Sequence, residues 1–270
     1  MKVTVEIGIF MHEDASGEVK EKEKKLREKL QTYVVGNAGT VIGDLYRVDY
    51  KGPMHMEIMK FWEDTHQLDL YVDYFFECTE EELKQAKMFM LSPTSHYVQS
   101  RELYEYPCEN CGCMILDNKK KIKVSKTIKG GNPRRIFQFG EGIEELVCVS
   151  VELYNYLIEN GIHSYDFSPV YKGENIQAYA FTPEKEYNIR SSIYDYTRCD
   201  MCGREYAFLN IEKGYGLEKH ELCDEIDFSE HDVLKTTVYY ENEQRILISP
   251  KLFFLIRDYI KSEEALAIFA

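Results

Sequence analysis

Two copies of one short cysteine motif are the residues in this chain whose types and spacing best fit a specific chemistry. The first copy reads CENCG from Cys108, and the second reads CDMCG from Cys199. Two thiolates separated by two residues can bind one metal ion from a tight turn, and the glycine that follows allows a positive φ that points backbone N–H groups at the sulfurs. A closed tetrahedral zinc site needs four such ligands. The sequence therefore predicts one structural Zn²⁺ bound by four cysteines that are remote in the chain: Cys108, Cys111, Cys199 and Cys202.

Two other interpretations of these four thiols stay open at the level of the sequence. The first is that they bind no metal, as in a site that this protein has lost. The second is a redox pair, but a thioredoxin-type pair lies where a strand enters a helix, whose end lowers the thiol pKa. Neither motif leads directly into a convincing helical pattern, so the zinc interpretation is favoured.

The remaining cysteines are assigned from their surroundings. Cys113 lies two residues beyond Cys111 and could compete as a ligand, although we expect it to point the other way. Cys78 and Cys148 lie in apolar segments and are expected in the core. Cys223 lies near His220 in an acidic segment, where a solvated loop is favoured over a second metal site.

No pattern of catalytic residues is recognisable. The seven histidines form no helical pair that could bind a metal, and the chain has no serine elbow, HExxH motif, Walker motif or dinucleotide fingerprint. Ser150 and Ser249 each precede a helical pattern, but helix capping accounts for both of them. We therefore expect that the protein is not an enzyme and has no catalytic residues.

Composition limits the class of partner and the compartment. The 270 residues carry a formal net charge of −14, which disfavours binding to nucleic acid and suits a basic protein partner. No apolar run approaches the ~20 residues that span a bilayer, and the alternating residues from Val3 to Ile9 resemble a strand rather than a signal peptide. We therefore expect a cytoplasmic protein with no membrane contact, in which metal binding or free thiols are favoured over disulfides.

The first hundred residues predict a small α+β unit. Alternating apolar residues indicate strands over 2–10, 54–62 and 68–78. The charged segment 18–33 has only a narrow apolar stripe, which indicates either a helix or a partly ordered loop. A capping box at Thr79 predicts a helix over 80–90. The boundary of this unit is expected near residue 100.

Residues 101–270 predict a second α+β region that the zinc ion would hold together. Leu146–Val149 is a short apolar strand, Ser150 is a good N-cap, and residues 151–160 have a helical stripe. The same order of strand, serine and helix recurs at Arg245–Ile248 and Ser249, where Pro250 takes the first helical position. We interpret the two strand-Ser-helix units as a degenerate internal repeat within an α+β fold.

The basic segment 119–135 supports an alternative function. Lysines and arginines beside a zinc knuckle can bind nucleic acid, which would make the chain a zinc-ribbon nucleic-acid-binding or regulatory protein. However, the segment has no aromatic residue before its end, so bases have nothing to stack on. The alternation from Lys121 to Val124 also fits the solvated face of a strand, where lysines discourage unwanted pairing.

At the two CxxCG motifs the sequence resembles the double-CXXCG motif family of bacterial proteins, some of which are immunity proteins of polymorphic toxin systems. The segment LVCVSVELYNYLIENGIHSYDFSP, residues 146–169, is similar to immunity-type proteins of such systems. The resemblance covers roughly residues 100–270 and implies that the four motif cysteines are metal ligands and that catalysis is absent. It also implies a function: binding and neutralising a cognate protein toxin, which the acidic charge predicts to be basic.

Overall fold

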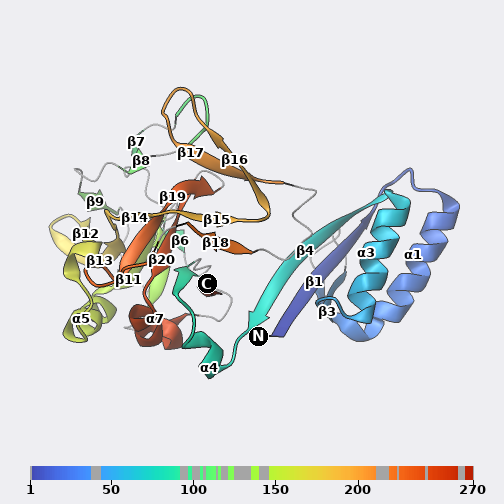
Figure 1. Cartoon of the computed structure of the whole chain (residues 1–270), viewed down its shortest axis with the longest axis horizontal. Helices are drawn as coiled ribbons and strands as arrows, with labels where there is room; N and C mark the ends of the chain where they lie inside the picture. Colours follow the sequence, from blue (N-terminus) through green and yellow to red (C-terminus); the bar gives the residue numbers. More distant parts are fainter. Residues whose placement is uncertain are drawn as a thin grey trace. The chain divides into compact units, whose positions relative to one another are not determined.

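In the computed structural model the protein has a mixed α+β fold (Figure 1), as the sequence predicts. The structure describes residues 2–37, 44–91, 97–98, 104–105, 108–113, 115–116, 121–124, 135–139, 146–210, 219–223, 225–240, 243–260 and 265–269. The chain divides into two compact units, Met1–Glu82 and Leu83–Ala270. This division lies earlier in the chain than the expected one between residues 1–100 and 101–270.

Over its described residues, the first unit contains a four-stranded antiparallel sheet and two α-helices. Its elements in chain order are β1 (Lys2–Met11), α1 (Gly17–Leu30), η1 (Gln31–Tyr33), β2 (Val34–Asn37), β3 (Asp44–Asp49), α3 (Pro53–Thr65) and β4 (Leu68–Glu77). The strand order is β2-β3-β1-β4, and each neighbouring pair is antiparallel. This βαββαβ order is the ferredoxin-like, or split β-α-β, arrangement.

The amino-acid pattern explains how the sheet and α1 pack. Val5, Ile7 and Ile9 alternate along β1 and are buried, as the period of two predicts for a half-buried strand. Helix α1 begins after Ser16, whose side chain accepts a hydrogen bond from the backbone N–H of Val19. Its buried side chains are few, so α1 packs through the narrow stripe that the sequence indicates: Val19, Leu26 and Leu30.

The strand predicted over residues 54–62 is wrong, because these residues form most of α3. Pro53 occupies the first turn, where its missing N–H and fixed φ favour a helix start. The helix ends at His66, whose φ of 49° is left-handed and whose backbone N–H donates to the carbonyl of Trp62. Ile58 is buried on the packed side of the helix.

The helix predicted over residues 80–90 is also mostly wrong. The capping box at Thr79 forms, since its hydroxyl and the Glu82 carboxylate each accept a backbone N–H of the other residue. The helix α4 spans only Glu80–Leu83, and the buried segment Met88–Leu91 is a strand, β5. Strand β5 pairs with two strands from the end of the chain, which is why the second unit begins well before residue 101.

The second unit contains two larger sheets. The first has the order β6 (Tyr97–Val98), β10 (Ile136–Phe139), β11 (Leu146–Ser150), β13 (Asn175–Phe181), β12 (Phe167–Lys172) and β9 (Ile122–Lys123). The second has the order β16 (Tyr194–Arg198), β17 (Glu205–Leu209), β19 (Val233–Tyr240), β20 (Glu243–Ile248), β5 and β21 (Ala265–Ile268), with β14 (Glu186–Tyr187) beside β19. Two short pairs complete it: β15 (Ile189–Ser191) with β18 (His220–Leu222), and β7 (Tyr104–Glu105) with β8 (Ile115–Leu116).

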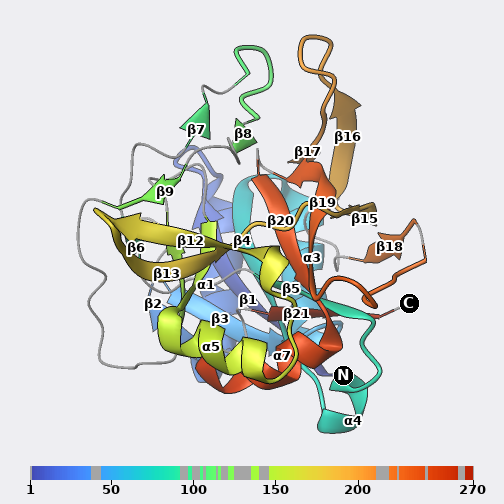
Figure 2. The same cartoon turned by 90° about the vertical axis from the view of Figure 1, so that its left-hand side faces the viewer.

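Both predicted strand-Ser-helix units are present, and their helices lie side by side (Figures 1 and 2). Helix α5 (Val151–Glu159) follows β11, and helix α7 (Pro250–Ile256) follows β20; the short helices η2 (Ser164–Asp166) and η3 (Arg257–Tyr259) come after them. Ser150 and Ser249 cap α5 and α7, each accepting a backbone N–H three residues later. The two helices share one hydrophobic core, to which they contribute Leu153, Leu157, Leu252, Phe253 and Ile256. Within the described part of the chain no helix is long and apolar enough to cross a membrane.

Candidate metal centre

Each CxxCG motif forms the turn of a two-stranded hairpin. Strands β7 and β8 flank the first motif, and strands β16 and β17 flank the second. The two hairpins project from the same side of the second unit, so their tips come together (Figure 2). This arrangement brings residues that are 91 positions apart into contact.

The two turns repeat one hydrogen-bond pattern. The N–H of Gly112 donates to the carbonyl of Cys108 over 2.8 Å, and the N–H of Gly203 donates to the carbonyl of Cys199 over 2.8 Å. The two glycines have φ angles of 70° and 73°, a region that other L residues rarely adopt. The glycine in each motif is therefore required by the backbone of the turn.

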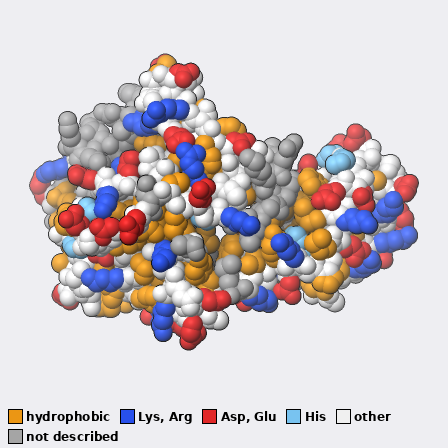
Figure 3. Space-filling view, in the orientation of Figure 1, with side chains coloured by type: hydrophobic (Ala, Val, Ile, Leu, Met, Phe, Trp, Pro, Cys, Tyr) orange, Lys and Arg blue, Asp and Glu red, His pale blue; other side chains and the backbone are white. Residues whose placement is uncertain are grey.

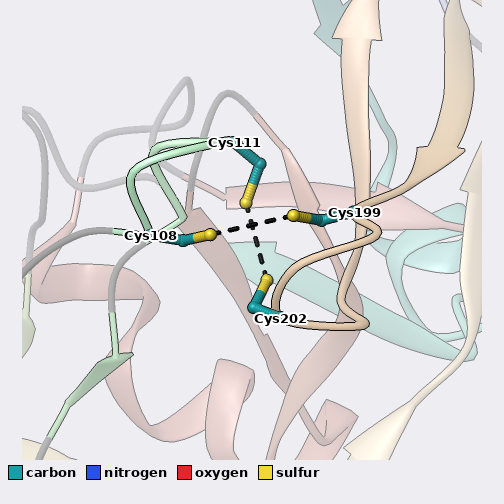
Figure 4. Close-up of side chains that lie close together, drawn as sticks. All are labelled: Cys108, Cys111, Cys199 and Cys202. Atoms are coloured by element: carbon teal, nitrogen blue, oxygen red, sulfur yellow. Dashed lines mark hydrogen bonds between the residues drawn. The ribbon is translucent and has the colours of Figure 1, made fainter.

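The four motif sulfurs form a compact group (Figure 4). All four Sγ atoms lie within 4.8 Å of one another. The Sγ atoms of Cys108 and Cys199 are 3.7 Å apart, and those of Cys111 and Cys202 are 3.6 Å apart. A tetrahedral ion with metal–sulfur bonds of about 2.3 Å has sulfur–sulfur edges of about 3.8 Å. The structure thus places the four predicted cysteines in an arrangement that can hold one metal ion.

Hydrogen-bond donors near the sulfurs favour thiolates. The backbone N–H groups of Cys111 and Asn110 lower the pKa of Cys108. The pKa of Cys199 is lowered to about 6, chiefly by the backbone N–H of Cys202 and by the side chain of Asn110. The Asn110 amide lies 3.4 Å from the Cys199 sulfur and so links the two turns directly.

Burial acts in the opposite direction on Cys111. Desolvation raises the pKa of this thiol, because burial disfavours its charged form, and hydrogen bonds with neighbouring thiols raise it further. A divalent metal ion reverses this effect, since it deprotonates a coordinating thiol outright. A bound cation would therefore favour the thiolate form of the four cysteines.

Four protein ligands fill a tetrahedral shell, which leaves no position for water or substrate. Cys199 is buried, and the other three cysteines are half-buried. In metalloproteins such closed sulfur sites have structural roles, whereas catalytic sites keep one position open. The geometry fits an ion that fixes the two hairpin tips against each other.

The other candidate ligands lie outside this cluster. Cys113 is fully buried, and its backbone carbonyl accepts the N–H of Cys108. This backbone hydrogen bond helps to close the first turn. Among the residues that the structure describes, the only group of three or more potential metal ligands is the four motif cysteines, which leaves out His220 and Cys223. Cys148 is buried, as the sequence predicts, whereas Cys78 is only half-buried.

The basic segment 119–135 is described only in part, and residues 119–120 and 125–134 lie outside the described residues. Lys121 and Lys123 are exposed, while Ile122 and Val124 are buried. This alternation is the strand face that the sequence favours, and β9 lies at the edge of its sheet. Its partner is β12, which runs parallel to it, so the strand is not part of a simple hairpin.

Two contacts near the sulfurs were not predicted from the sequence. Asn110 lies inside the first motif but bonds to the second one, so its role depends on how the two hairpins meet. The Arg204 guanidinium, just after the second motif, interacts with Cys202 and lies 5.6 Å from the ring centre of Tyr239. A cation beside a group of thiolates offsets part of their negative charge.

Comparison with protein-family models, with curated proteins and with solved structures finds no match to this chain. The function must therefore be inferred from the chain's own residues. The four-cysteine cluster is the strongest constraint among them, because it fixes both a ligand set and its geometry.

Proposed function

We propose that the four cysteines bind one structural Zn²⁺. Thiolate ligands select zinc, copper(I) or iron–sulfur clusters, and a tetrahedral S₄ site of mononuclear size is typical of zinc. The sulfur–sulfur distances of 3.6 Å and 3.7 Å support this choice, since they match a single central ion. The role is to hold two hairpins in one orientation, so that the second unit presents a rigid surface.

The same features lead to a function in binding rather than in catalysis. The protein is proposed to be a cytoplasmic, non-enzymatic immunity-type protein that binds and neutralises a cognate protein toxin. The observation that carries this proposal is the pairing of two CxxCG turns into one four-sulfur cluster, because these motifs carry the resemblance to the double-CXXCG family. The net charge of −14 supports a basic toxin as the partner, since it steers a basic protein toward this one.

A growth competition tests the immunity function directly. A host strain that lacks this gene is mixed with the parental strain, and its surviving cells are counted. If the function is immunity, the deletion strain is killed by its siblings and a plasmid copy of the gene restores survival. Equal survival with and without the gene would remove the proposal.

Metal analysis tests the zinc assignment separately from the function. Purified protein is expected to contain one zinc per chain and to show no visible absorption. An iron–sulfur cluster would absorb strongly in the visible range, and a protein without metal would contain no zinc and would likewise show no visible absorption.

The rival function is binding of nucleic acid through residues 119–135. Labelled oligonucleotides distinguish the two functions, because affinity for phosphates falls steeply with salt. Of this segment's described residues, Lys121, Lys123 and Arg135 are the cations that could contribute. Binding at physiological salt that is lost on replacing Lys121 and Lys123 would favour the rival.

A further inference from the structure

A cluster of one tyrosine and two histidines stands on the surface of the second unit. Tyr165, in η2, is 54% exposed. The His163 ring stacks on it with ring centres 5.2 Å apart and planes 25° apart. The His231 ring meets it edge-on, with centres 5.0 Å apart and planes 80° apart. We call these three side chains the Tyr165 cluster.

A buried carboxylate fixes the first histidine. The Asp232 side chain accepts from the backbone N–H of His163 over 3.3 Å and lies 3.0 Å from its ring nitrogen Nδ1. The other oxygen of Asp232 accepts the Ser249 hydroxyl over 2.8 Å, at the cap of α7. His163 is thus anchored to the helix start of the second strand-Ser-helix unit.

A second buried carboxylate fixes the other histidine. Asp166 is completely buried, and one of its oxygens lies 2.8 Å from Nδ1 of His231. Its other oxygen accepts the backbone N–H groups of Asp232 and Val233 over 2.9 Å and 3.2 Å. Each imidazole is therefore held through its Nδ1 atom by a buried carboxylate. The Tyr165 ring contacts two histidine rings whose orientations are fixed in this way.

The surroundings of Tyr165 are negatively charged. Desolvation is the largest cause that raises the pKa of Tyr165, and the negative charges of Asp166, Glu230 and Asp232 raise it further. Glu230 is exposed next to the cluster. Figure 3 shows acidic side chains beside histidines on the left of the molecule, in the region where Figure 1 draws β12.

From this geometry we propose that the Tyr165 cluster is a preformed contact point for a cationic side chain, arginine or lysine, on a partner protein. The inference rests on the proposed function, in which that partner is the basic toxin. An exposed tyrosine ring in a negative field attracts a guanidinium or ammonium group. Tyrosine is also enriched among the few residues that dominate binding energies at protein interfaces.

The buried half of this arrangement has a structural explanation, but the exposed half does not. Asp166 and Asp232 tie together three segments that are remote in sequence, which stabilises the fold whether or not Tyr165 is present. Tyr165 is 54% exposed, and the hydrogen bonds of Asp166 and Asp232 do not involve its hydroxyl. Its ring is held in place before binding, so little conformational freedom is lost when a partner docks.

The growth competition described above tests this contact with a matched pair of variants. Tyr165→Ala removes the ring, and Phe208→Ala removes a ring that is similarly exposed, at 49%, in the same unit. Tyr165→Ala is expected to reduce survival at least about tenfold at equal protein level and melting temperature, whereas Phe208→Ala protects like the unchanged protein. Tyr165→Phe keeps the ring and should protect nearly fully. Full protection by Tyr165→Ala would overturn the inference while leaving the immunity function intact.

A binding measurement judges the cluster even if the gene gives no protection. The probe is a fluorescent hexa-arginine peptide at low salt, with hexa-glutamate as the control peptide. Tyr165→Ala is expected to weaken the hexa-arginine affinity by about threefold to tenfold relative to Phe208→Ala. Equal affinities of the two variants would overturn the contact. Failure of protection by the unchanged gene would instead remove only the immunity function.

Discussion

Each of the four motif cysteines would be indispensable to the proposed metal site, because a closed tetrahedral shell has no spare ligand. Cys199 is the most buried of the four, and both the backbone and Asn110 stabilise its thiolate. Replacing it removes a charged ligand and leaves three thiols around an incomplete site. The effect should therefore reach the fold of the whole second unit, since metal binding and folding are coupled.

Cys199→Ser is expected to lose most of the bound metal and to lower the melting temperature of the second unit by about 10 °C. Elemental analysis and calorimetry on the same sample measure the two effects together. Cys223→Ser is the matched control, since that cysteine is exposed and lies outside the cluster. A Cys199→Ser protein with unchanged metal content and stability would show that the site is not shared between the two motifs.

The environment of His55 predicts that the stability of the first unit depends on pH. The side chain is only 5% exposed, and neither ring nitrogen has a hydrogen-bond partner among the described residues. Its ring packs edge-on against Tyr50, with ring centres 5.1 Å apart. Desolvation, and then the charge of Lys51, lower the pKa of His55 below its ordinary value of 6.5. The unfolded chain therefore binds a proton at a higher pH than the folded one, so stability falls as the pH decreases below about 6.5.

Replacing His55 by phenylalanine keeps an aromatic ring in the same place and removes the titration. The free energy of unfolding of His55→Phe is expected to change less between about pH 7.5 and pH 5.5 than that of the unchanged protein. Denaturant titrations followed by Trp62 fluorescence measure this difference, because Trp62 lies in α3 of the same unit. Parallel pH curves for the two proteins would contradict the assignment.

Among the elements, those with a signal contained in a few adjacent residues could be predicted from the sequence. The serine caps of α5 and α7 follow from a hydroxyl placed just before an apolar stripe. Helix α3 and strand β5 could not be predicted in this way. The apolar residues of α3 fit both a period of two and a helical period, and a short apolar run such as β5 is ambiguous until its partners are known.

The candidate site, like the elements, could be predicted from the sequence only in part. The four ligands were predictable because CxxCG is a local motif, but the link from Asn110 to Cys199 depends on the meeting of two hairpins. The Tyr165 cluster gave no signal in the sequence, since His231 and its partner Asp166 are 65 positions apart. Contacts of that kind are set by the packing of sheets, which a single sequence does not display.

The cap of α7 should be more sensitive to mutation than an isolated cap. The Ser249 hydroxyl accepts the N–H of Leu252 over 3.1 Å and donates to buried Asp232 over 2.8 Å. Ser249→Ala therefore removes a cap and leaves a buried carboxylate with one donor fewer, for a combined cost of about 2–4 kcal/mol. Ser249→Thr keeps the hydroxyl and is expected to cost less than about 1 kcal/mol. Urea unfolding of the second unit compares them, and equal losses would show that neither the cap nor the bond to Asp232 contributes to stability.

For the whole molecule, the division into Met1–Glu82 and Leu83–Ala270 separates two kinds of stability. The first unit has a sheet and helices with their own buried side chains, and none of its described residues belongs to the four-cysteine cluster. The second unit joins distant hairpins through four sulfurs, in addition to the core that α5 and α7 share. Loss of metal should therefore affect one unit and spare the other.

The single tryptophan of the chain, Trp62, makes this separation measurable, because it lies in the first unit. In the Cys199→Ser protein, or after excess chelator, the far-ultraviolet circular dichroism should show an early transition from the second unit. The Trp62 fluorescence transition should stay within about 2 °C of its value in the metal-bound protein, since the unit around it loses no ligand. A tryptophan transition that moves together with the metal-dependent one would mean that the two units unfold as one cooperative body.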